Sequence, residues 1–559
     1  MVKYMMKFVL GRVSLALCLL ISQTSVLASA ESVPFENFPV GDAVPQIGQM
    51  DWDWVHSKVR NMVVQVFVFR TEFNWVEPYK TPHQGMASGS AFFIDQAGLL
   101  MTNAHVVNAE HGIYIQIPCF GKRRFDVEVV GICPDRDLAL LKVVAEDLVV
   151  IKDELGALPV LEFGDSDKIK RAEELLTLGY PLGQQSLKST MGVVSGRQAI
   201  EGSFMIQIDA PISPGNSGGP ALDKTGKVIG INTGSMDAER AQNVNYIIPS
   251  NEVRLFLKQL DQAPVCRGVR LLRKPFLGLL VSDGSEDMAR FLKNPLTGGV
   301  YIPGVIPGSP LDKAGVKEGD MLYAIDGHEI DYYGEIKVDW NEERVAAIDY
   351  VSRLDPGETV HLTTYRNGAK REVSVQTVFA DMLPIRIFYP EYEAIDYEVI
   401  GGMVVMELAI NHMPILIKMN PRLSRYLELE NQFASKLVVT HLLPNSEAVK
   451  CRVLRPGMLI DEINGRKVTT LKEFRNAVKA GQPSGYLTMR LDIESLGGIL
   501  AVLPLARVLE DEPRLAATYF YRVTPFVESL SSHTRASSRP GARLLPAFAG
   551  ALGGSGNGH

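Results

Sequence analysis

Between Asn61 and Ser250 the sequence is a succession of short β-rich runs separated by turns, and this pattern limits the possible fold more than any other feature. Many short strands with turns at regular spacing favour antiparallel barrels or sandwiches over alternating β–α units. A stretch of about 200 residues suits two small barrels packed together, and a helix predicted over Ser250–Gln259, capped by Ser250, closes it. The predicted strands are Met62–Arg70, Gly89–Asp95, Gly112–Ile117, Phe125–Ile132, Leu138–Val143, Leu175–Gly179, Gly192–Gly196, Met205–Ile208, Lys227–Ile231 and Val244–Ile248.

An internal repeat follows the β-rich region. The first copy contains Val305–Gly315 and Glu318–Gly327, and the second contains Leu442–Ala448 and Pro456–Gly465. Each copy predicts a strand, a short helix, a turn, a second strand and a tight turn. We therefore expect two related modules behind the barrels.

Capping residues define the short helix of the first copy. Ser309 is the expected N-cap, Pro310 suits the first helical position and Gly315 suits the C-terminal stop. The second copy has Arg452 where a glycine should fall, so its helix must end differently. The dipeptide Asn367–Gly368 predicts a hairpin turn that completes the first copy.

The N-terminus has the features of an export signal. Basic residues precede the apolar run Val13–Ile21, and Ala28–Ala30 forms the small-x-small pattern that signal peptidase accepts. The run is shorter than the about 20 residues that span a bilayer. We expect cleavage after Ala30, no stable membrane span in the product, and a periplasmic or secreted location.

Length and charge bound the possible functions. A chain of 559 residues suggests three or four domains, and its formal net charge of −7 argues against nucleic acid as the main partner. No cysteine and histidine residues group at the spacing of zinc ligands, and the sequence shows no dependence on disulfides. The cysteines beyond the signal are Cys119, Cys133, Cys266 and Cys451.

The strongest chemical signal is the glycine-rich string Pro214–Pro220, which contains Ser217. A serine becomes a nucleophile when a base removes its proton and donors stabilise the oxyanion, and glycines let backbone N–H groups approach a carbonyl. The alternatives are a plain surface turn and the G-x-S-x-G elbow of α/β-hydrolases. The elbow must open a helix, but Pro220 and a turn follow here, so that interpretation fails.

A histidine and an aspartate upstream complete a constellation. His105 ends an apolar stretch among small residues, and Asp137 stands at the head of the apolar run Leu138–Val143. A lone histidine is usually structural, and an acid at a strand end is usually a cap. Together with Ser217 they give the order His, Asp, Ser, which is the chymotrypsin-type order on β-barrels.

These residues closely resemble the HtrA/Deg family of trypsin-like serine proteases with PDZ domains, over about residues 60–260, with the repeats similar to its PDZ domains. The resemblance implies an all-β, chymotrypsin-like double β-barrel followed by two α+β PDZ-like domains. It also implies ATP-independent proteolysis of unfolded or misfolded proteins, no cofactor or metal, and homo-oligomers built from trimers. The matching strings are Gly89–Asp95, Thr102–Val107, Asp137–Leu141, Asp209–Pro220 and Gly230–Thr233.

Carried over by position, the resemblance assigns roles to the site. Ser217 is the nucleophile, His105 the general acid/base and Asp137 the group that orients His105. The N–H groups of Gly215 and Ser217 form the oxyanion hole, with Asn216 shaping the loop.

The same resemblance places Ile212 and Met236 in the primary specificity pocket. Pro211 stands six residues before the serine, where pockets that select Lys or Arg carry an aspartate. An apolar pocket for Val, Ile, Leu or Ala follows.

PDZ modules bind extended peptides by adding a strand to a sheet edge, and a backbone nest holds the terminal carboxylate. In the first copy the candidate loop is Phe276, Leu277, Gly278 and Leu279; in the second, the weaker candidate is Ile400–Val404. Either copy can instead be a packing module or an oligomer contact, and the role of the insert at 380–436 stays open. The expected partners are unfolded polypeptides and protein C-termini.

The leading function is a quality-control serine endopeptidase, and the alternative is a chaperone-like binding or scaffold protein with an inactive protease fold.

The expected domains run in a simple order along the chain. Residues 1–30 are a signal peptide, 31–50 a linker, 51–262 the protease, 268–380 the first PDZ domain, 381–510 an atypical second PDZ domain, and 511–559 a C-terminal extension, disordered from about 531.

Overall fold

The computed structural model describes residues 52–108, 110–200, 202–234, 244–379, 383–492 and 497–537. The predicted signal peptide and linker lie outside these residues. The chain divides into two compact units. The first holds most residues up to Ala394 together with Tyr426–Phe433, and the second holds Asn74–Thr81, Ile395–Arg425 and the residues from Ala434 onward.

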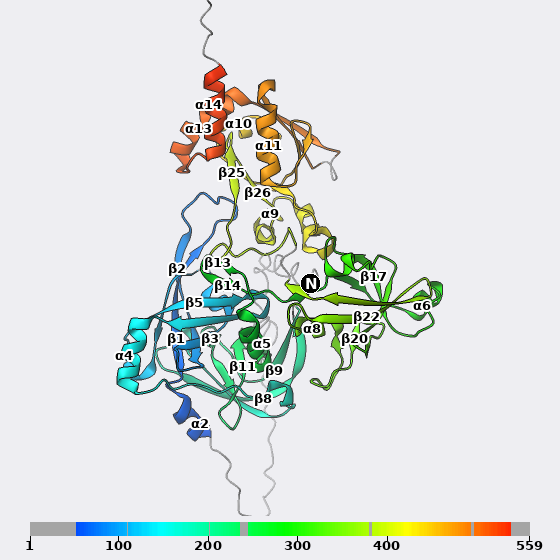
Figure 1. The fold of residues 1–559 in the computed structure, drawn as a ribbon. Coiled ribbons are helices and arrows are strands. Elements are labelled where there is room, and N and C mark those ends of the chain that lie inside the picture. Colours follow the sequence, from blue (N-terminus) through cyan, green and yellow to red (C-terminus); the bar gives the residue numbers. More distant parts are fainter. Residues whose placement is uncertain are drawn as a thin grey trace, which may run out of the picture. The chain divides into compact units, whose positions relative to one another are not determined.

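The N-terminal part of the first unit is a six-stranded ring (Figure 1). Its strands follow the order β5-β4-β1-β2-β3-β6, and a β5–β6 pairing closes it. Alternate apolar residues such as Val64, Val66 and Val68 point into its core. The strands are β1 (Val63–Glu72), β2 (His83–Phe93), β3 (Leu99–Thr102), β4 (Glu110–Gln116), β5 (Phe125–Cys133) and β6 (Leu138–Val143), and the helices are α2 (Trp52–Val59), α3 (Ala104–Val107) and α4 (Ala145–Leu155). The short strand β14 (Val269–Leu271) pairs with β5, and β13 (Val265–Cys266) pairs with β14.

A second closed barrel follows, in the order β10-β11-β12-β9-β8-β7. Both barrels are antiparallel, which confirms the double-barrel fold expected from the sequence. The strands are β7 (Glu174–Gly179), β8 (Lys188–Ile200), β9 (Ser203–Ile208), β10 (Pro220–Leu222), β11 (Val228–Thr233) and β12 (Asn245–Pro249).

The helix that closes the barrels, α5 (Ser250–Leu260), forms where it is predicted, but its start differs. The sequence analysis takes Ser250 as the N-cap, and this is wrong. Pro249 occupies the cap position, and the Ser250 hydroxyl donates to the carbonyl of Gly164 at 2.9 Å. A tertiary acceptor has replaced the local cap.

The first copy of the repeat, residues 275–379, forms a sheet of order β16-β17-β18-β22-β23, with β19 beside β18. Its apolar core includes Ile302, Leu322 and Val360. The strands are β15 (Pro275–Phe276), β16 (Leu279–Ser282), β17 (Val300–Val305), β18 (Met321–Ile325), β19 (His328–Glu329), β20 (Glu335–Ile336), β21 (Val345–Ala346), β22 (Thr359–Arg366), β23 (Ala369–Gln376) and β24 (Val378–Phe379), and the helices are α6 (Glu286–Phe291), α7 (Pro310–Lys313) and α8 (Ala347–Ser352).

The capping signals of the first copy are confirmed. The Ser309 hydroxyl accepts a hydrogen bond from the N–H of Asp312, and Gly315 follows α7 with φ of 78°. Asn367 and Gly368 both have positive φ and join β22 to β23, as expected for a two-residue hairpin.

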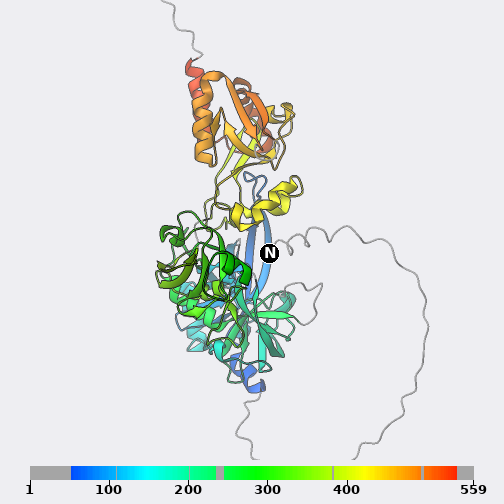
Figure 2. The ribbon, with the colours of Figure 1, turned by 90° about the vertical axis from the view of Figure 1, so that its right-hand side faces the viewer.

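The second copy, residues 395–425 and 434–537, has the sheet order β25-β26-β27-β28-β30-β31, with β29 beside β28. Helices α11, α13 and α14 lie beside this sheet (Figures 1 and 2). Its short helix α10 is followed by Arg452 with φ of 64°, so a non-glycine residue takes the left-handed position. The elements are β25 (Tyr397–Ile400), β26 (Met403–Glu407), α9 (Met413–Leu416), β27 (Leu437–Leu442), α10 (Glu447–Lys450), β28 (Leu459–Ile463), β29 (Arg466–Lys467), α11 (Leu471–Gly481), β30 (Tyr486–Leu491), β31 (Ile499–Pro504), α13 (Leu505–Tyr519) and α14 (Pro525–Ser537).

Two predicted boundaries of the second copy need correction. The boundary at 510 falls inside α13, and Val508, Val527 and Leu530 belong to the same apolar core as the sheet. The predicted disorder from about 531 is also wrong at its start, because α14 continues to Ser537. The apolar stripes of both helices explain the difference, since their burial adds to the core. Residues 538–559 lie outside the described part of the chain.

Residues Asn74–Thr81 connect β1 to β2 but belong to the second unit. The Trp75 ring meets the His412 ring edge-on, and Thr440 donates to the carbonyl of Val76 at 2.9 Å.

Within the described ranges, no helix is long and apolar enough to cross a membrane. The cysteines at 119, 133, 266 and 451 are all free.

Candidate active site

His105 and Asp137 meet at one end of the first barrel. His105 lies on α3, which directly follows β3, and Asp137 directly precedes β6, the strand that pairs with β3. The Nδ1 atom of His105 lies 2.8 Å from Oδ2 of Asp137, and the backbone N–H of His105 donates to Oδ1 at 2.9 Å. Thr233, at the end of β11, donates its hydroxyl to Oδ2 at 3.0 Å. The carboxylate is therefore fixed from three sides and can orient the imidazole.

The backbone at Asp137 is held in an unusual conformation. Asp137 has φ of 54° and ψ of 43°, in the left-handed region that few residues besides glycine and short polar residues adopt. It follows the 3₁₀ turn Pro134–Arg136, and its N–H donates to the carbonyl of Pro134 at 3.1 Å. Asn103 donates its side-chain amide to the carbonyl of Asp137 at 3.0 Å. This turn aims the carboxylate back toward His105.

Ser217 lies in a tight loop between β9 and β10 and is largely buried. The loop packs against Ser90 of the first barrel. The N–H of Ser90 donates to the carbonyl of Ser217 at 2.9 Å, and the hydroxyl of Ser90 donates to the carbonyl of Gly215 at 2.7 Å. Gly215 has φ of 102°, and an added Cβ would lie 2.3 Å from the carbonyl oxygen of Tyr180. Only glycine fits this position.

Two donors in the loop are unpaired. Among the described residues, the backbone N–H groups of Gly215 and Ser217 have no acceptor, whereas that of Asn216 donates to the carbonyl of Ser213. A free pair of N–H groups flanking a serine is what stabilisation of an oxyanion requires. No hydrogen bond joins His105 to the Ser217 hydroxyl in the described part of the chain. Catalytic hydrogen bonds are often long before substrate binds.

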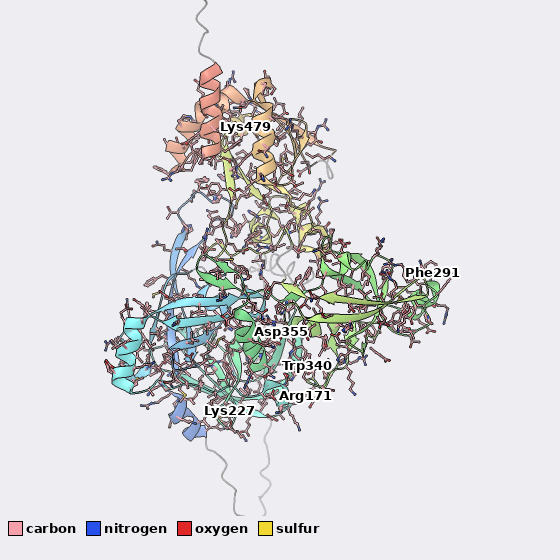
Figure 3. All side chains as sticks on the ribbon, in the orientation of Figure 1. Arg171, Lys227, Phe291, Trp340, Asp355 and Lys479 are labelled. Atoms are coloured by element: carbon pink, nitrogen blue, oxygen red, sulfur yellow. The ribbon has the colours of Figure 1, made fainter. Side chains whose placement is uncertain are left out.

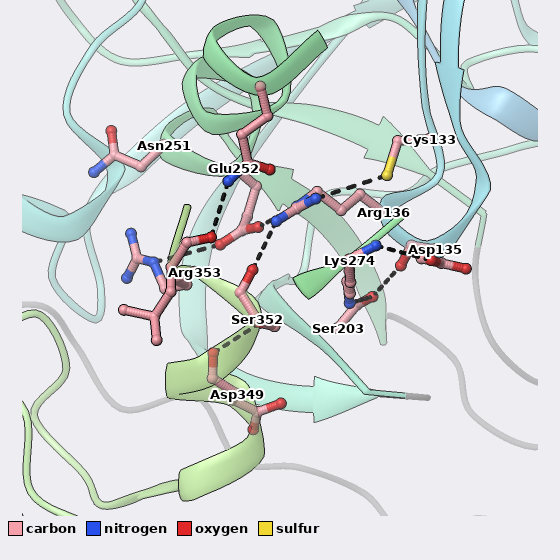
Figure 4. Close-up of polar contacts among 12 residues, drawn as sticks. Cys133, Asp135, Arg136, Ser203, Asn251, Glu252, Lys274, Asp349, Ser352 and Arg353 are labelled. Carbon is pink, nitrogen blue, oxygen red and sulfur yellow. Dashed lines mark hydrogen bonds and ion pairs between the residues drawn. The ribbon is translucent and has the colours of Figure 1, made fainter. Parts of the chain in front are cut away.

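A buried polar network surrounds the turn Pro134–Arg136 that precedes Asp137 (Figure 4). The Arg136 side chain is almost completely buried, and it donates to Glu252 of α5 at 3.1 Å and to the carbonyl of Ser352, at the end of α8, at 2.7 Å. Asp135 pairs with Arg273 at 3.0 Å. The two residues before Asp137 are thus bonded to the first copy of the repeat or to the segment that leads into it.

More contacts join the first copy to the barrels along the same border, where Figure 3 labels Arg171, Trp340 and Asp355. Arg353 bonds both carboxylate oxygens of Asp167, at 2.9 and 3.2 Å, and its guanidinium lies 4.1 Å from the centre of the Trp340 ring. Lys258 pairs with Asp355. The border is charged and specific.

The residues expected in the specificity pocket are only partly described. Ile212 is half-buried and packs against the core of the second barrel, and Pro211 is exposed. Met236 lies outside the described residues. Position 211 carries an uncharged proline and not the aspartate of pockets that select Lys or Arg.

The peptide-binding loop predicted in the first copy precedes the edge strand β16. Gly278 has φ of 86°, and an added Cβ would lie 2.1 Å from Cβ of Ser309. The carbonyls of Leu277 and Gly278 accept from the N–H groups of Leu311 and Ile306. Phe276 and Leu279 flank the loop in β15 and β16, so all four predicted residues lie together.

Sequence reasoning missed three residues that support the histidine–aspartate pair. Thr233 was part of a matching string but received no role, and its hydroxyl bond to Asp137 spans 96 positions. Asn103 precedes His105 by two positions, which marked it only as a neighbour. Arg136 directly precedes Asp137 and is buried, but its partner Glu252 is 116 positions away in the chain.

Comparison with known proteins agrees with this geometry. Residues 89–231 match the trypsin-like peptidase domain, and residues 275–377 match the PDZ domain. A probable periplasmic serine endoprotease DegP-like from Marinomonas sp. (strain MWYL1) is 28% identical over 411 residues, which cover 72% of this chain and 76% of that protein. Serine protease HTRA1 of Xenopus tropicalis is 30% identical over 335 residues, which cover 57% of this chain and 65% of that protein. The chain is a serine endopeptidase with a trypsin-like peptidase domain and a PDZ domain, and it is similar to DegP-like and HTRA1 serine proteases.

Proposed function

We propose that the chain cleaves polypeptides through Ser217, His105 and Asp137. The observation that carries this assignment is the bonded His105–Asp137 pair, together with a glycine loop in which the N–H groups of Gly215 and Ser217 have no acceptor among the described residues. Nε2 of His105 takes the proton of Ser217 as its oxygen attacks the scissile carbonyl, and Asp137 keeps Nδ1 protonated and oriented. The imidazolium then protonates the leaving amine.

An acyl-enzyme on Ser217 follows from this first step. Water, deprotonated by His105, attacks the ester carbonyl, and Ser217 leaves with the proton. The N–H groups of Gly215 and Ser217 hold the oxyanion in both steps, and Asn216 fixes the loop between them. Loss of one such donor typically costs about 10²–10³ in kcat.

The pocket for the residue before the cleaved bond is apolar in this proposal. Ile212 and Met236 line it, and Pro211 stands where a pocket for Lys or Arg needs an acid. Peptide mapping of a digest should show cleavage mainly after Val, Ile, Leu or Ala. Predominant cleavage after Lys or Arg would contradict this assignment of the pocket.

The substrates in this proposal are unfolded or misfolded proteins, which the first copy captures by their C-termini. The support is the edge strand β16 and the adjoining loop at Gly278, since PDZ domains hold peptides at such an edge. The degradation needs no ATP, and the enzyme works as a trimer or a multiple of trimers. The name of the Marinomonas relative and the signal at Ala28–Ala30 support a periplasmic or secreted location, with a mature N-terminus at Glu31.

The test is digestion of an unfolded protein such as reduced casein without ATP. The wild-type protein should degrade it and should take up a fluorophosphonate label at Ser217. The Ser217→Ala protein should do neither while retaining its fold by circular dichroism. Equal digestion by both proteins would sink the triad assignment, and digestion by neither would favour the binding or scaffold alternative.

A further inference from the structure

The two copies of the repeat have the same sheet apart from one strand. The order β16-β17-β18-β22-β23 of the first copy corresponds to β26-β27-β28-β30-β31 of the second. Each copy also carries a two-residue strand beside its third strand, β19 in the first and β29 in the second. The second copy adds β25 outside β26, at the edge that corresponds to the outer edge of β16, where no strand pairs in the described part of the first copy.

The loops that precede these edge strands make matching hydrogen bonds. The carbonyls of Leu277 and Gly278 accept from the N–H groups of Leu311 and Ile306, and those of Gly401 and Gly402 accept from Ala448 and Leu443. An added Cβ at Gly278 would lie 2.1 Å from Cβ of Ser309, and one at Gly402 would lie 2.1 Å from Cβ of Ser446. The loop geometry of a PDZ peptide site is therefore present in the second copy.

The edge beside that loop is already paired. Strand β25 runs antiparallel to β26, with Tyr397 opposite Met406 and Ile400 opposite Met403. A peptide bound to a PDZ domain adds a strand to this same edge. Because β25 leads directly into the loop, its C-terminal end points where the C-terminus of a bound peptide points.

One residue of the loop explains why only the second copy closes on itself. Gly401 and Gly402 have φ of 59° and 80°, and a two-residue hairpin of type I′ needs positive φ at both positions. The first copy has Leu277 in place of Gly401, and Leu277 does not have positive φ. Its preceding strand, β15, pairs with β24 instead.

Side chains of helix α11 hold β25 in place. Arg475 donates to the carbonyl of Tyr397 at 3.1 Å, to Glu398 at 2.8 Å and to both oxygens of Asp396, at 2.7 and 2.8 Å. Glu398 is fully buried and also accepts from the hydroxyl of Thr524. Because α11 also packs on β26, β25 lies against both the helix and the strand.

A carboxyl group of the chain occupies the loop as well. Glu512 of α13 is 1% exposed, and its Oε2 accepts from the N–H of Gly401 at 3.0 Å while Oε1 accepts from the hydroxyl of Tyr521 at 2.6 Å. In the first copy the corresponding N–H, that of Leu277, has no acceptor among the described residues. The side chain of Glu512 thus lies where a PDZ domain holds the terminal carboxylate of its peptide.

We propose that the second copy is a PDZ-type binding site whose ligand is this chain itself. Strand β25 takes the place of the bound peptide and Glu512 takes the place of its terminal carboxylate. The site is therefore closed to the C-termini of other proteins. This inference goes beyond the proposed function, because it holds whether or not the first copy captures peptides.

Amide hydrogen exchange by mass spectrometry on full-length Ser217→Ala protein tests the proposal. The probe is a ten-residue peptide with a free C-terminal valine. Residues 397–407 should exchange slowly without the peptide and should not change when it is added. Fast exchange there that the peptide slows would overturn the proposal. Residues 276–282 report separately on the first copy, so failure of its capture role is distinguishable.

Two variants open the site from different sides. Gly401→Leu installs the first-copy residue and disfavours positive φ, and Glu512→Gln replaces one of the two oxygen atoms that accept from Gly401 and Tyr521. Each should raise exchange at residues 397–407 about tenfold, as expected for a loss of about 1.4 kcal/mol. Gly465→Leu is the matched control, since Gly465 has φ of 74° in another turn of the same copy with open space around it. Exchange at 397–407 that neither variant raises above the control would contradict the proposal.

Discussion

In the first copy of the repeat the strand before the glycine loop, β15, leaves to pair with β24, whereas in the second copy the strand before the loop, β25, folds back onto β26. The loops themselves make the same backbone bonds in both copies. Binding capacity therefore depends on what happens to the neighbouring sheet edge. A second glycine, Gly401, and a distant carboxyl group, Glu512, turn a peptide site into part of a core.

The copies also differ in what they are attached to. The end of α8 in the first copy accepts from Arg136, the residue before Asp137, and Arg353 bonds Asp167 of the barrels. In the second copy the helix in the corresponding position, α11, directs Arg475 to its own β25. The first copy is thus bonded to the catalytic barrels, whereas the second uses its arginine to close its own edge.

The largest expected effect is on catalysis, which we expect to be independent of peptide binding by either copy of the repeat. Ser217→Ala should lower turnover by about 10⁴–10⁶, because members of a triad act as a unit. Peptide affinity of the same protein should not change, since Ser217 lies in neither copy. Hydrolysis of a chromogenic peptide and calorimetric titration measure the two properties. Hydrolysis by purified Ser217→Ala protein within tenfold of wild type would contradict the assignment.

The pH dependence of the second copy comes next. Burial raises the pKa of Glu512 to about 7, against 4.5 for the free side chain, and the nearby Glu398 and Asp511 add to the rise. A raised carboxyl pKa stabilises the folded state below pH 4.5, and this contribution is lost as the pH rises through about 7. The loss is at most about 3.4 kcal/mol, from 1.36 kcal/mol for each pKa unit.

Denaturant unfolding of wild type and Glu512→Gln between pH 4.5 and 8 measures this contribution. The difference in unfolding free energy between the two proteins should shift in favour of the Glu512→Gln protein as the pH rises, since the amide has no charge to bury. The other carboxyl groups are the same in both proteins, so their contributions to the unfolding free energy cancel in this difference. A difference that stays constant with pH would show that Glu512 is not held as an uncharged group in the fold.

A matched pair of glycine substitutions gives the smallest effect. Gly278→Ala and Gly402→Ala force a Cβ against Ser309 and Ser446 at the same distance, 2.1 Å, so their strain is alike. Only Gly278→Ala should slow degradation of unfolded casein, by about tenfold, which corresponds to about 1.4 kcal/mol of lost capture. Cleavage of a short chromogenic peptide should be unchanged in both proteins. Equal slowing of casein degradation by the two variants would remove the distinction between the copies.

Local chemistry made much of this molecule predictable. The barrel strands, the cap at Ser309 and the turn at Asn367–Gly368 follow from residues close together in the chain, and His105 and Ser217 stand in strings with few alternatives. The prediction for Ser250 failed because the carbonyl of Gly164 offered a tertiary partner that no local rule describes.

The closed edge of the second copy also depends on a partner that is distant in the chain. Gly401 and Gly402 form a two-residue hairpin turn, whereas the sequence analysis predicts only a weaker peptide-binding loop at Ile400–Val404. The partner of Gly401, Glu512, is 111 positions away, and nothing near that residue in the sequence marks it as buried. Contacts of this kind become visible only once helix α13 is packed on the sheet.

The number of peptides that each chain binds shows whether the second copy is closed to external C-termini. Full-length Ser217→Ala protein is titrated by calorimetry with the ten-residue peptide that ends in a free valine. We expect one peptide per chain, which is lost when Gly278→Ala is added to Ser217→Ala and retained when Gly402→Ala is added instead. Two peptides per chain, or a single peptide lost only with Gly402→Ala, would contradict this expectation.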